Sequence, residues 1–424
     1  MTRLSELREV EELAVFKKER RAGSLRRTTE GAAFEYDSEY FLELQRDPAL
    51  ALASTLGAQA QTHEVRGVNL HPFFAGLLPE GLRQKALLSA LKTSADDLFS
   101  MLAAGGGDTI GDVSVALDGG EPRVTRERSL PSVDEIDFNE MFHAVIGVDS
   151  LAERKRDVMI AGVQPKLSAQ RISFPVALKK RNRNCILKLG SPEYPRLVHN
   201  EHFCMSAARA CGVDVALTEI VLDRGGNAGL LVERFDRVPV GKSSRFTSLH
   251  QEDACQFLGR YPQDKYRLTL REICGGLGDV CTSPIIETSH LLRQYLFSYL
   301  IGNGDLHAKN ISVLESRDGI RTGLAPAYDL VSTLPYGDEE MALQLDGKRG
   351  NFKRENFLTF GERVGVRRAA VEQLLDRTLR AWSRILPTSA TVGWDEKSTR
   401  TIHKALERRA RVLSEESPGG KRRA

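Results

Sequence analysis

The feature that most constrains the fold of this chain is the run from Gly302 to Asn310, which directly follows a strongly apolar segment. The apolar segment, residues 288 to 301, predicts a buried and rigid helix. Gly302 and Gly304 then allow a sharp turn of the backbone, which brings Asp305 into a cleft. A long buried helix that ends in a tight polar loop therefore fixes the position of one acid.

A second acid, Asp329, follows the loop after two apparent strands. Residues 311 to 314 read as the first strand and residues 323 to 328 as the second. Phosphoryl transfer from ATP needs a carboxylate to orient and deprotonate a hydroxyl, and Asp305 suits this role. It also needs oxygen ligands for Mg²⁺, and the side chains of Asn310 and Asp329 carry them. This order of elements predicts an ATP-dependent kinase.

The other polar side chains of the loop are less specific. Lys309 is placed to steady a phosphate, whereas His307 is more typical of a structural hydrogen-bonding residue than of a base. Without the helix before it and the acid after it, the spacing of Asp305 and Asn310 would indicate only a polar loop with capping side chains.

A kinase also needs a lysine on a strand to pair with the ATP phosphates. Lys188 fits because it is a single charge in an apolar strand, and Glu201 on the following helix is the candidate acid to hold it. Each has a simpler alternative. Lys188 could be an edge-strand lysine that faces water, and Glu201 could be an acid favoured in the first turn of its helix.

Two further segments are candidates for nucleotide contacts. The first is a polar run with one glycine between apparent strands, whose backbone amides could lie over phosphates. The second ends a strand and begins a loop, where a hinge would present backbone groups to adenine and Asp236 to ribose; its alternative is a strand end with a charge pair. The residues are Ala161, Gly162, Val163, Gln164, Pro165 and Lys166 in the first segment, and Glu233, Arg234, Phe235 and Asp236 in the second.

The amino-terminal part reads as strands followed by helices. A strand, a basic turn and a strand are expected between residues 13 and 36, and a helical rhythm runs from residue 73 to 103. Residues 105 to 108 predict a flexible turn, because the Gly-Lys-Ser/Thr of a Walker loop is missing. A solvated face rather than a nucleic-acid surface is expected for the basic side chains of the hairpin. They are Lys17, Lys18, Arg20, Arg21, Arg26 and Arg27.

Composition argues against several classes of protein. The formal net charge of +3 does not indicate a strong nucleic-acid binder. The six cysteines are scattered without a Cys-x-x-Cys pair, so neither a zinc ribbon nor a dithiol redox site is supported. Scattered single thiols suit the reducing cytoplasm. Neither an apolar signal segment nor a membrane span is expected.

Taken in order, these segments resemble the HipA family, the serine/threonine-kinase toxins of bacterial toxin–antitoxin pairs. The resemblance runs over most of the chain, and its pieces are far more specific together than any one of them alone. The matching residues are 73–80, 161–166, 187–189, 200–201, 233–237, 251–256, 304–310 and 328–329.

The resemblance implies a role for each matching residue. Asp305 would be the catalytic base, Asn310 and Asp329 would hold Mg²⁺, and Lys188 would contact the phosphates. The other ATP contacts that it implies are residues 161–166, residues 233–235, His307, Ala308, Lys309, Asn310 and Tyr328.

The resemblance also implies partners. Members of the family phosphorylate aminoacyl-tRNA synthetases, which stalls charging and growth, and a HipB-like helix-turn-helix antitoxin restrains them. Operator DNA would be bound mainly through that antitoxin. Two departures stand out: Met159 replaces a serine whose autophosphorylation inactivates HipA, and in the stretch matching the family's DNA contacts, residues 357 to 368, Glu362 lies among Arg363, Arg367 and Arg368.

The expected fold is α+β, with a two-lobed, protein-kinase-like core. The expected divisions are a small α/β amino-terminal subdomain (1–125), a nucleotide lobe (126–245), a mainly helical catalytic lobe (246–415) and a disordered basic tail (416–424). Two rival functions remain open: a small-molecule kinase of the aminoglycoside or choline type, which has a similar loop, and an idle partner that scaffolds an antitoxin–operator complex.

Overall fold

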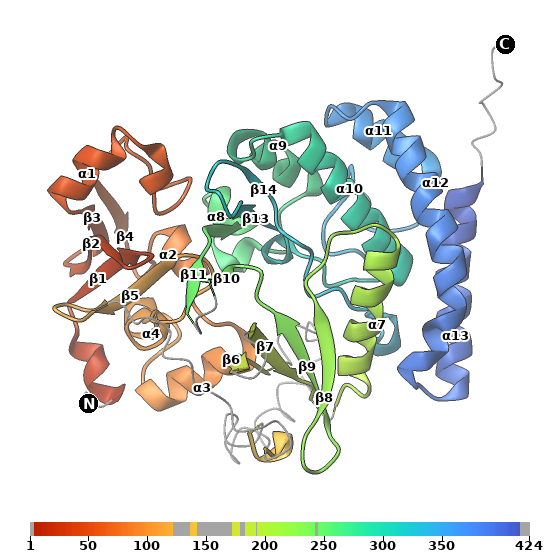
Figure 1. Cartoon of the computed structure of the whole chain (residues 1–424), viewed down its shortest axis with the longest axis horizontal. Coiled ribbons are helices and arrows are strands. Elements are labelled where there is room, and N and C mark those ends of the chain that lie inside the picture. The colour runs from red at the N-terminus through yellow and green to blue at the C-terminus, as the bar shows by residue number, and fades with distance from the viewer. Residues whose placement is uncertain are drawn as a thin grey trace.

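The computed structural model describes residues 4–121, 136–141, 172–178, 183–191, 193–241 and 245–415. The expected phosphate loop at 161–166, Met159, the tail and most of the expected linker at 118–138 lie outside the described residues. Figure 1 shows the amino-terminal sheet at one side of the molecule, a second sheet with α7 in the middle, and the long helices at the other side.

The amino-terminal subdomain is built on a five-stranded antiparallel sheet with its own hydrophobic core. The strand, turn and strand predicted for residues 13 to 36 are present, but the structure has three strands there instead of two; the helical run from 73 to 103 consists of three short helices. The strands are β1 (Glu12–Lys17), β2 (Arg20–Thr28), β3 (Gly31–Tyr36), β4 (Thr62–Arg66) and β5 (Val113–Leu117), in the order β4-β3-β2-β1-β5. The helices are η1 (Leu4–Glu9), α1 (Ser38–Leu44), η2 (Pro48–Leu50), α2 (Pro72–Gly76), α3 (Gly81–Leu91) and α4 (Leu98–Gly105).

The basic hairpin departs from the expected solvated face at Lys17. This side chain is buried, and its ammonium group lies 3.0 Å from Asp112 Oδ2 and donates to the Ala51 carbonyl oxygen at 2.8 Å. The register of β1 against β2 shifts between Val15 and Phe16, and such bulges re-aim the side chains beside them. The prediction was wrong at this position because β1 has a neighbouring strand on each side and its end is covered.

A second antiparallel sheet follows in the nucleotide lobe. Helix α7 (Leu197–Ala210) packs against its strands β8 and β9. The sheet contains β6 (Ile172–Leu178), β7 (Arg183–Leu189), β8 (Thr218–Leu222) and β9 (Ala228–Glu233) in the order β6-β7-β9-β8, and a ribbon of β10 (Arg237–Pro239) and β11 (Phe246–Ser248) follows. The expected strand that carries Lys188, the helix that carries Glu201 and the strand that ends at the hinge are confirmed as β7, α7 and β9.

The helical lobe carries the largest hydrophobic core, which Trp382 helps to fill by packing edge-to-face on Phe297 at 5.9 Å. None of the described helices is long and apolar enough to cross a membrane. A small sheet joins β12 (Gln251–Asp253), β13 (Ser312–Glu315) and β14 (Thr322–Leu324). The helices are α8 (Ala254–Phe257), η6 (Pro262–Asp264), α9 (Leu270–Val280), α10 (Pro284–Ile301), η7 (Ala308–Asn310), η8 (Leu334–Tyr336), α11 (Arg354–Arg363), α12 (Arg368–Ile385), η9 (Leu386–Val392) and α13 (Glu396–Ser414).

Helix α10 is the predicted buried helix, and it begins four residues earlier than expected. Pro284 occupies its first turn, where a proline costs no hydrogen bond. Gly302 ends the helix with φ of 67°, and a side chain there would lie 2.5 Å from Leu334. At Gly304 a side chain would lie 2.7 Å from the carbonyl oxygen of Glu340. Both glycines are therefore needed for the turn that places Asp305.

Candidate active site

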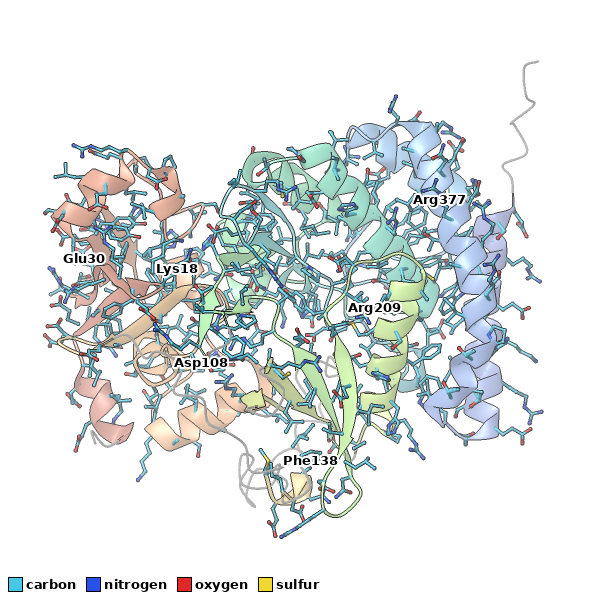
Figure 2. The ribbon with its side chains drawn as sticks, in the orientation of Figure 1. Lys18, Glu30, Asp108, Phe138, Arg209 and Arg377 are labelled. Carbon is cyan, nitrogen blue, oxygen red and sulfur yellow. The ribbon has the colours of Figure 1, made fainter. Side chains whose placement is uncertain are left out.

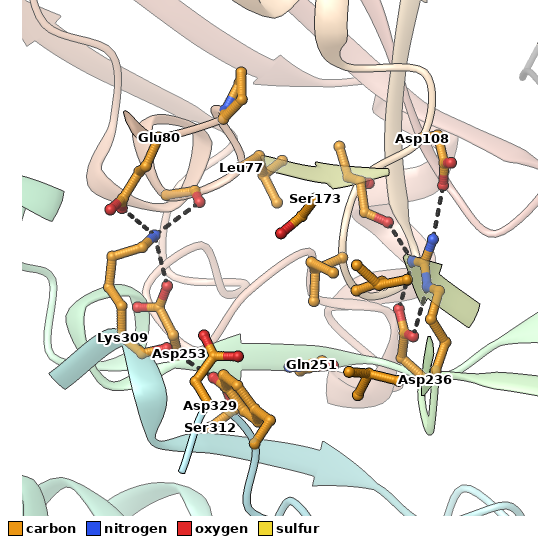
Figure 3. A pocket seen from close by; sticks show the side chains of 18 of the residues that line it. Leu77, Glu80, Asp108, Ser173, Asp236, Gln251, Asp253, Lys309, Ser312 and Asp329 are labelled. Carbon is orange, nitrogen blue, oxygen red and sulfur yellow. Dashed lines mark hydrogen bonds and ion pairs between the residues drawn. The ribbon is translucent and has the colours of Figure 1, made fainter. Parts of the chain in front are cut away.

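A cavity of about 310 Å³ opens where the three parts of the chain meet (Figure 3). Residues 76–80, Gly105 and residues 108–110 of the amino-terminal subdomain form one wall. Strands β7 and β9 with residues 232–236 form the second, and β12, β13 and the loop that carries Lys309 form the third. The amino-terminal subdomain thus closes a cleft that lies between the two other lobes.

Lys188 reaches into this cavity from β7 and joins acids from two other elements. Its Nζ lies 2.7 Å from Glu201 Oε1 on α7 and also forms an ion pair with Asp329. The predicted pairing with Glu201 is confirmed. The alternative of an edge lysine facing water is wrong, because β7 lies between β6 and β9 and the Lys188 side chain is only 8% exposed.

Asp305 lies buried at the end of the turn after α10. The Tyr266 hydroxyl donates to its Oδ1 at 2.8 Å, and the Asp305 N–H donates to Asn303 Oδ1 at 3.1 Å. Tyr266 also lines a second hollow, of about 500 Å³, together with residues 337–342 and Arg349. Asp305 is thus oriented by a hydroxyl that faces a hollow distinct from the first cavity.

Asn310 and Asp329, the two expected metal ligands, are brought together. Asn310 Nδ2 donates to Asp329 Oδ2 at 3.3 Å, and Asn310 Oδ1 accepts from the His307 N–H at 3.3 Å. Asp329 has a φ of 57°, a left-handed conformation that residues other than glycine rarely adopt. Its carboxylate is thereby placed between Asn310 and Lys188.

The structure offers a donor set that fits a hard cation. Among the described residues no group of three or more His, Cys, Asp or Glu side chains could hold a metal on its own. Asn310 and Asp329 together bring oxygen atoms of an amide and a carboxylate to one place. Such a pair suits Mg²⁺, which commonly keeps waters and takes one or two protein ligands together with phosphate oxygens.

His307 is neutral and buried beside this pair. Its ring packs edge-to-face on Tyr266 at 5.0 Å, and neither ring nitrogen has a hydrogen-bond partner in the described parts of the chain. Burial, assisted by the charge of Lys265, lowers the pKa of His307 to about 4. Its hydrogen bonds are made by the backbone, since its carbonyl accepts from the Asn310 N–H at 2.9 Å. The expected structural role is therefore carried by its main chain.

Lys309 is held by acids and does not face an open phosphate position. Its Nζ lies 2.9 Å from Asp253 Oδ2 and 3.4 Å from Glu80 Oε1, and donates to the Gly76 carbonyl oxygen at 3.0 Å (Figure 3). Burial opposes the charge, but Asp253 and Glu80 outweigh it and raise the pKa of Lys309. Because an ammonium group has three donors, we assign Lys309 to holding the loop against the amino-terminal subdomain. Glu80 also forms an ion pair with Lys265.

Tyr328 and Phe235 form an aromatic wall at the other side. Their ring centroids lie 5.9 Å apart. The Tyr328 hydroxyl donates to the Lys309 carbonyl oxygen at 2.7 Å and lies 2.5 Å from Ser312 Oγ. Burial raises the pKa of Tyr328 well above its usual value, so the hydroxyl stays protonated.

Asp236 is locked in a buried network at the hinge. Its Oδ2 accepts from Arg234 at 2.8 Å, from Arg237 at 2.7 Å and from the Gly111 N–H at 2.9 Å. Burial would raise the pKa of Asp236, but the two guanidinium groups lower it to about 2. The expected ribose contact is not available to a carboxylate that is already engaged in this way. The sequence did not indicate that the amino-terminal subdomain supplies Gly111 to this network.

The turn at residues 105 to 108 also belongs to the hinge region. Asp108 Oδ1 accepts from Arg234 at 3.0 Å, and Figure 2 shows Asp108 where the amino-terminal subdomain faces the rest of the chain. The turn therefore contributes a carboxylate to an arginine instead of amides to a phosphate. The other hinge acid, Glu233, accepts from Arg183 Nε at 2.8 Å.

Sequence reasoning missed several residues at this site. Tyr266, Glu80 and Asp108 each act across long stretches of chain, 39, 185 and 126 residues from Asp305, Lys265 and Arg234. No local sequence pattern predicts pairs between residues so far apart in the chain. Glu80 follows an apolar run, and an acid in that position could have suggested a cationic partner.

Two family models match the chain. The model of the HipA-like C-terminal domain matches residues 158–385, which is more than half of the chain, and the model of the HipA N-terminal domain matches residues 13–116.

Individual proteins agree with these models. "Putative kinase Y4mE" of Sinorhizobium fredii is 30% identical over 390 residues, which is 87% of this chain and 91% of that protein. The serine/threonine-protein kinase toxin HipA of Shewanella oneidensis is 29% identical over 287 residues, which is 64% of this chain and 65% of that protein.

A solved structure confirms the expected architecture. In the complex of Shewanella oneidensis HipA, HipB and operator DNA, the matching chain is 22% identical to this one and superposes with a TM-score of 0.71. The match covers 95% of this chain and 97% of that chain. The predicted two-lobed, kinase-like α+β fold is therefore confirmed.

Proposed function

Because the chain belongs to the HipA family of toxin kinases, we propose that it transfers the γ-phosphate of ATP to a serine or threonine hydroxyl of a protein. The observation that carries this proposal is the meeting of Lys188 and Asp329 at one cavity, with Asn310 bonded to Asp329 and Asp305 on the same loop as Asn310. Phosphoryl transfer depends almost entirely on positioning and electrostatic stabilisation. These residues supply both.

Asp305 is the group that receives or orients the proton of the acceptor hydroxyl. Its carboxylate is buried, and the hydrogen bond that the Tyr266 hydroxyl donates at 2.8 Å orients it. The acceptor enters through the hollow that Tyr266 lines with residues 337–342. Nucleotide and acceptor thus approach Asp305 from different cavities.

Lys188, Asn310 and Asp329 act on the phosphates. When bound with the nucleotide, Mg²⁺ supplies the positive charge that neutralises the phosphate oxygens. Asn310 and Asp329 would hold it, since both bring oxygen atoms to the same place. Glu201 keeps Lys188 directed into the cavity at 2.7 Å, so Lys188 remains in place for a phosphate when Asp329 turns to the metal.

The hinge leaves one backbone donor for the adenine ring. The N–H groups of Glu233 and Arg234 donate to the carbonyl oxygens of Leu217 and Asn184 at 2.8 and 2.9 Å. The Phe235 N–H has no hydrogen-bond partner within the described ranges, and we assign it to the base. The rings of Phe235 and Tyr328 supply the apolar wall beside it.

The physiological role follows the family. The acceptor is an aminoacyl-tRNA synthetase, its phosphorylation in the cytoplasm arrests growth, and a HipB-like antitoxin neutralises the kinase. The support is the relative named as a serine/threonine-protein kinase toxin and the solved complex of a related HipA with HipB and operator DNA.

Operator DNA is bound mainly through the antitoxin. In the stretch that matches the family's DNA contacts, Arg368 pairs with Glu355 at 2.7 Å and with Glu362 at 3.5 Å, and Arg363 pairs with Asp346 at 2.7 Å. Cations that are already paired with carboxylates contribute little to phosphate binding. This supports a minor role for these arginines in contacting DNA.

The proposal is tested by incubating the purified chain with γ-labelled ATP, Mg²⁺ and a bacterial lysate. A labelled protein band that disappears with Asp305→Asn is expected, and phosphoserine or phosphothreonine is expected in its hydrolysate. Label that appears only in small molecules would contradict protein phosphorylation. Transfer to neither fraction, by a chain that binds ATP, would contradict the kinase assignment itself.

A further inference from the structure

Arg83 differs from the other charged side chains that line the first cavity. Each of the others takes part in an ion pair, including Glu80, Lys188 and Asp253. Arg83 makes neither an ion pair nor a hydrogen bond with any part of the chain that the structure describes. Among the described residues it is therefore a cavity-lining cation without a partner.

The backbone around Arg83 is fixed by its neighbours in α3. Leu82 is buried in a cluster with Leu187 and Leu231 of the nucleotide lobe. Glu80, at the start of the helix, is tied to Lys309 at 3.4 Å. Arg83 is therefore carried on a segment that is anchored on both sides of the cavity, so its direction does not depend on a loose surface helix.

The Arg83 side chain is exposed to solvent at the wall of the cavity, so its guanidinium group is open to a ligand. Partial desolvation still lowers the pKa of Arg83, Asp108 opposes that effect and Arg234 adds to it. Asp108 is already committed to Arg234 at 3.0 Å. A guanidinium group presents five N–H donors and no acceptor. No acceptor in the described part of the chain is bonded to these donors, so they are available to acceptor atoms of a ligand.

We propose that Arg83 binds the nucleotide and is a contact that the amino-terminal subdomain contributes directly to the ATP site. The inference rests on the proposed function, since it takes the first cavity to be the nucleotide site. As a donor it would take phosphate oxygens, ribose oxygens or ring nitrogens of the purine. Arg83 would thereby supply a polar contact to the nucleotide in place of Asp236, whose carboxylate is engaged by Arg234 and Arg237.

The proposal changes the role of the amino-terminal subdomain. Residues 76–80 close the cavity by shape and by ion pairs with the catalytic loop. Arg83 adds a bond to the nucleotide, so that bound ATP links the subdomain to the two kinase lobes. Nucleotide binding and docking of the subdomain are then two aspects of one equilibrium.

The test is calorimetric titration of the full chain with ATP, ADP and adenosine, in the presence of Mg²⁺ and without acceptor. Arg83→Ala is expected to weaken ATP binding roughly 10- to 100-fold, the usual range for losing hydrogen bonds from a charged group. Lys92→Ala, at an exposed position at the end of the same helix that does not line the cavity, is the matched control and is expected to bind as the parent does. Arg83→Gln keeps much of the side-chain length without the charge and guards against a folding defect in the alanine variant.

The three ligands separate the possible contacts. Weaker binding of ATP and ADP alone would place Arg83 on a phosphate, and equal weakening with adenosine would place it on the ribose or base; both support the proposal. Unchanged affinity for all three ligands in both Arg83 variants would overturn it. Failure of the parent chain to bind ATP would instead overturn the proposed function.

Discussion

The first cavity has charged residues at both ends, the hinge end and the end beside residues 302–310 that we propose to be catalytic, but the charges are arranged differently. At the hinge end, Asp236, Arg234 and Arg237 form a closed network, and the Asp236 side chain is 3% exposed. At the catalytic end, Lys188 forms ion pairs with both Glu201 and Asp329, and the Asp329 side chain is 32% exposed. At the hinge end the charged groups stay paired with each other, whereas at the catalytic end the ion pairs can be replaced by contacts with a ligand.

This difference distinguishes charged groups that stabilise the fold from charged groups that we propose to act on ligands. A buried carboxylate that accepts four hydrogen bonds has little left to offer a ligand, and removing it leaves two arginines uncompensated. Asp305 instead accepts a hydrogen bond from the Tyr266 hydroxyl and, in the proposed function, takes the proton of the acceptor. Substitutions at the two ends should therefore affect different measurements.

The largest effect is expected for Asp305→Asn. The amide keeps the shape of the side chain but cannot take the proton, so kcat should fall about 10³-fold, within the range usual for losing a general base. The free energy of unfolding and the affinity for ATP should hardly change. Asp318→Asn, in an exposed turn, is the control. Undiminished phosphorylation by Asp305→Asn would show that the catalytic end has been misassigned.

Asp236→Asn should lower the stability of the fold and leave catalysis nearly unchanged. Loss of the carboxylate leaves Arg234 and Arg237 buried without compensation, so the free energy of unfolding should fall by roughly 3–5 kcal/mol. Urea unfolding measures it. At temperatures where the variant is folded, its KM for ATP should stay close to that of the parent. A large rise in KM for ATP with unchanged stability would contradict this prediction and would indicate that Asp236 contacts the ribose.

His307 makes the catalytic end sensitive to acid. Its native pKa of about 4 lies below the usual value of 6.5, so the unfolded chain binds the proton first as pH falls. The free energy of unfolding should therefore decrease between about pH 6.5 and 4, with His307 contributing roughly 2–3 kcal/mol to the decrease. His307→Gln should remove this share in urea titrations at several pH values. Identical pH dependence of the two proteins would contradict a buried, neutral imidazole.

Tyr266→Phe should give the smallest effect. It removes one hydrogen bond to Asp305 and leaves the ring packed on His307, so kcat should fall about tenfold. The KM for ATP should not change, because Tyr266 does not line the first cavity. Tyr261→Phe, five residues earlier, serves as the control in the same steady-state assay. A change in KM for ATP without a change in kcat would place Tyr266 on the nucleotide instead.

The sequence was most informative where local patterns determine the structure. The apolar run before Gly302 predicted α10, because a buried helix and its glycine cap are both local properties. The pairing of Lys188 with Glu201 followed from a single charge in an apolar strand, which requires a buried partner. These features need no knowledge of distant segments.

The sequence was least informative where a side chain finds its partner across the chain. Lys309 was expected near a phosphate, but Glu80, more than 200 residues earlier, and Asp253 use its donors. Asp236 was expected at the ribose, but residues of the amino-terminal subdomain and Arg237 complete its network. Both residue types suit either role, and only the tertiary arrangement decides between them.

The cavity has walls from three segments that are far apart in the chain, and this has a consequence for the timing of its assembly. A ribosome adds about 5–20 residues per second from the amino terminus. The wall formed by residues 76–80 is therefore made many seconds before Asp329, which completes the site. A nascent chain that ends before Asp329 has the first wall but lacks the catalytic end. The proposed phosphoryl transfer would therefore begin only after Asp329 has been made, and fragments that end before it would be inactive.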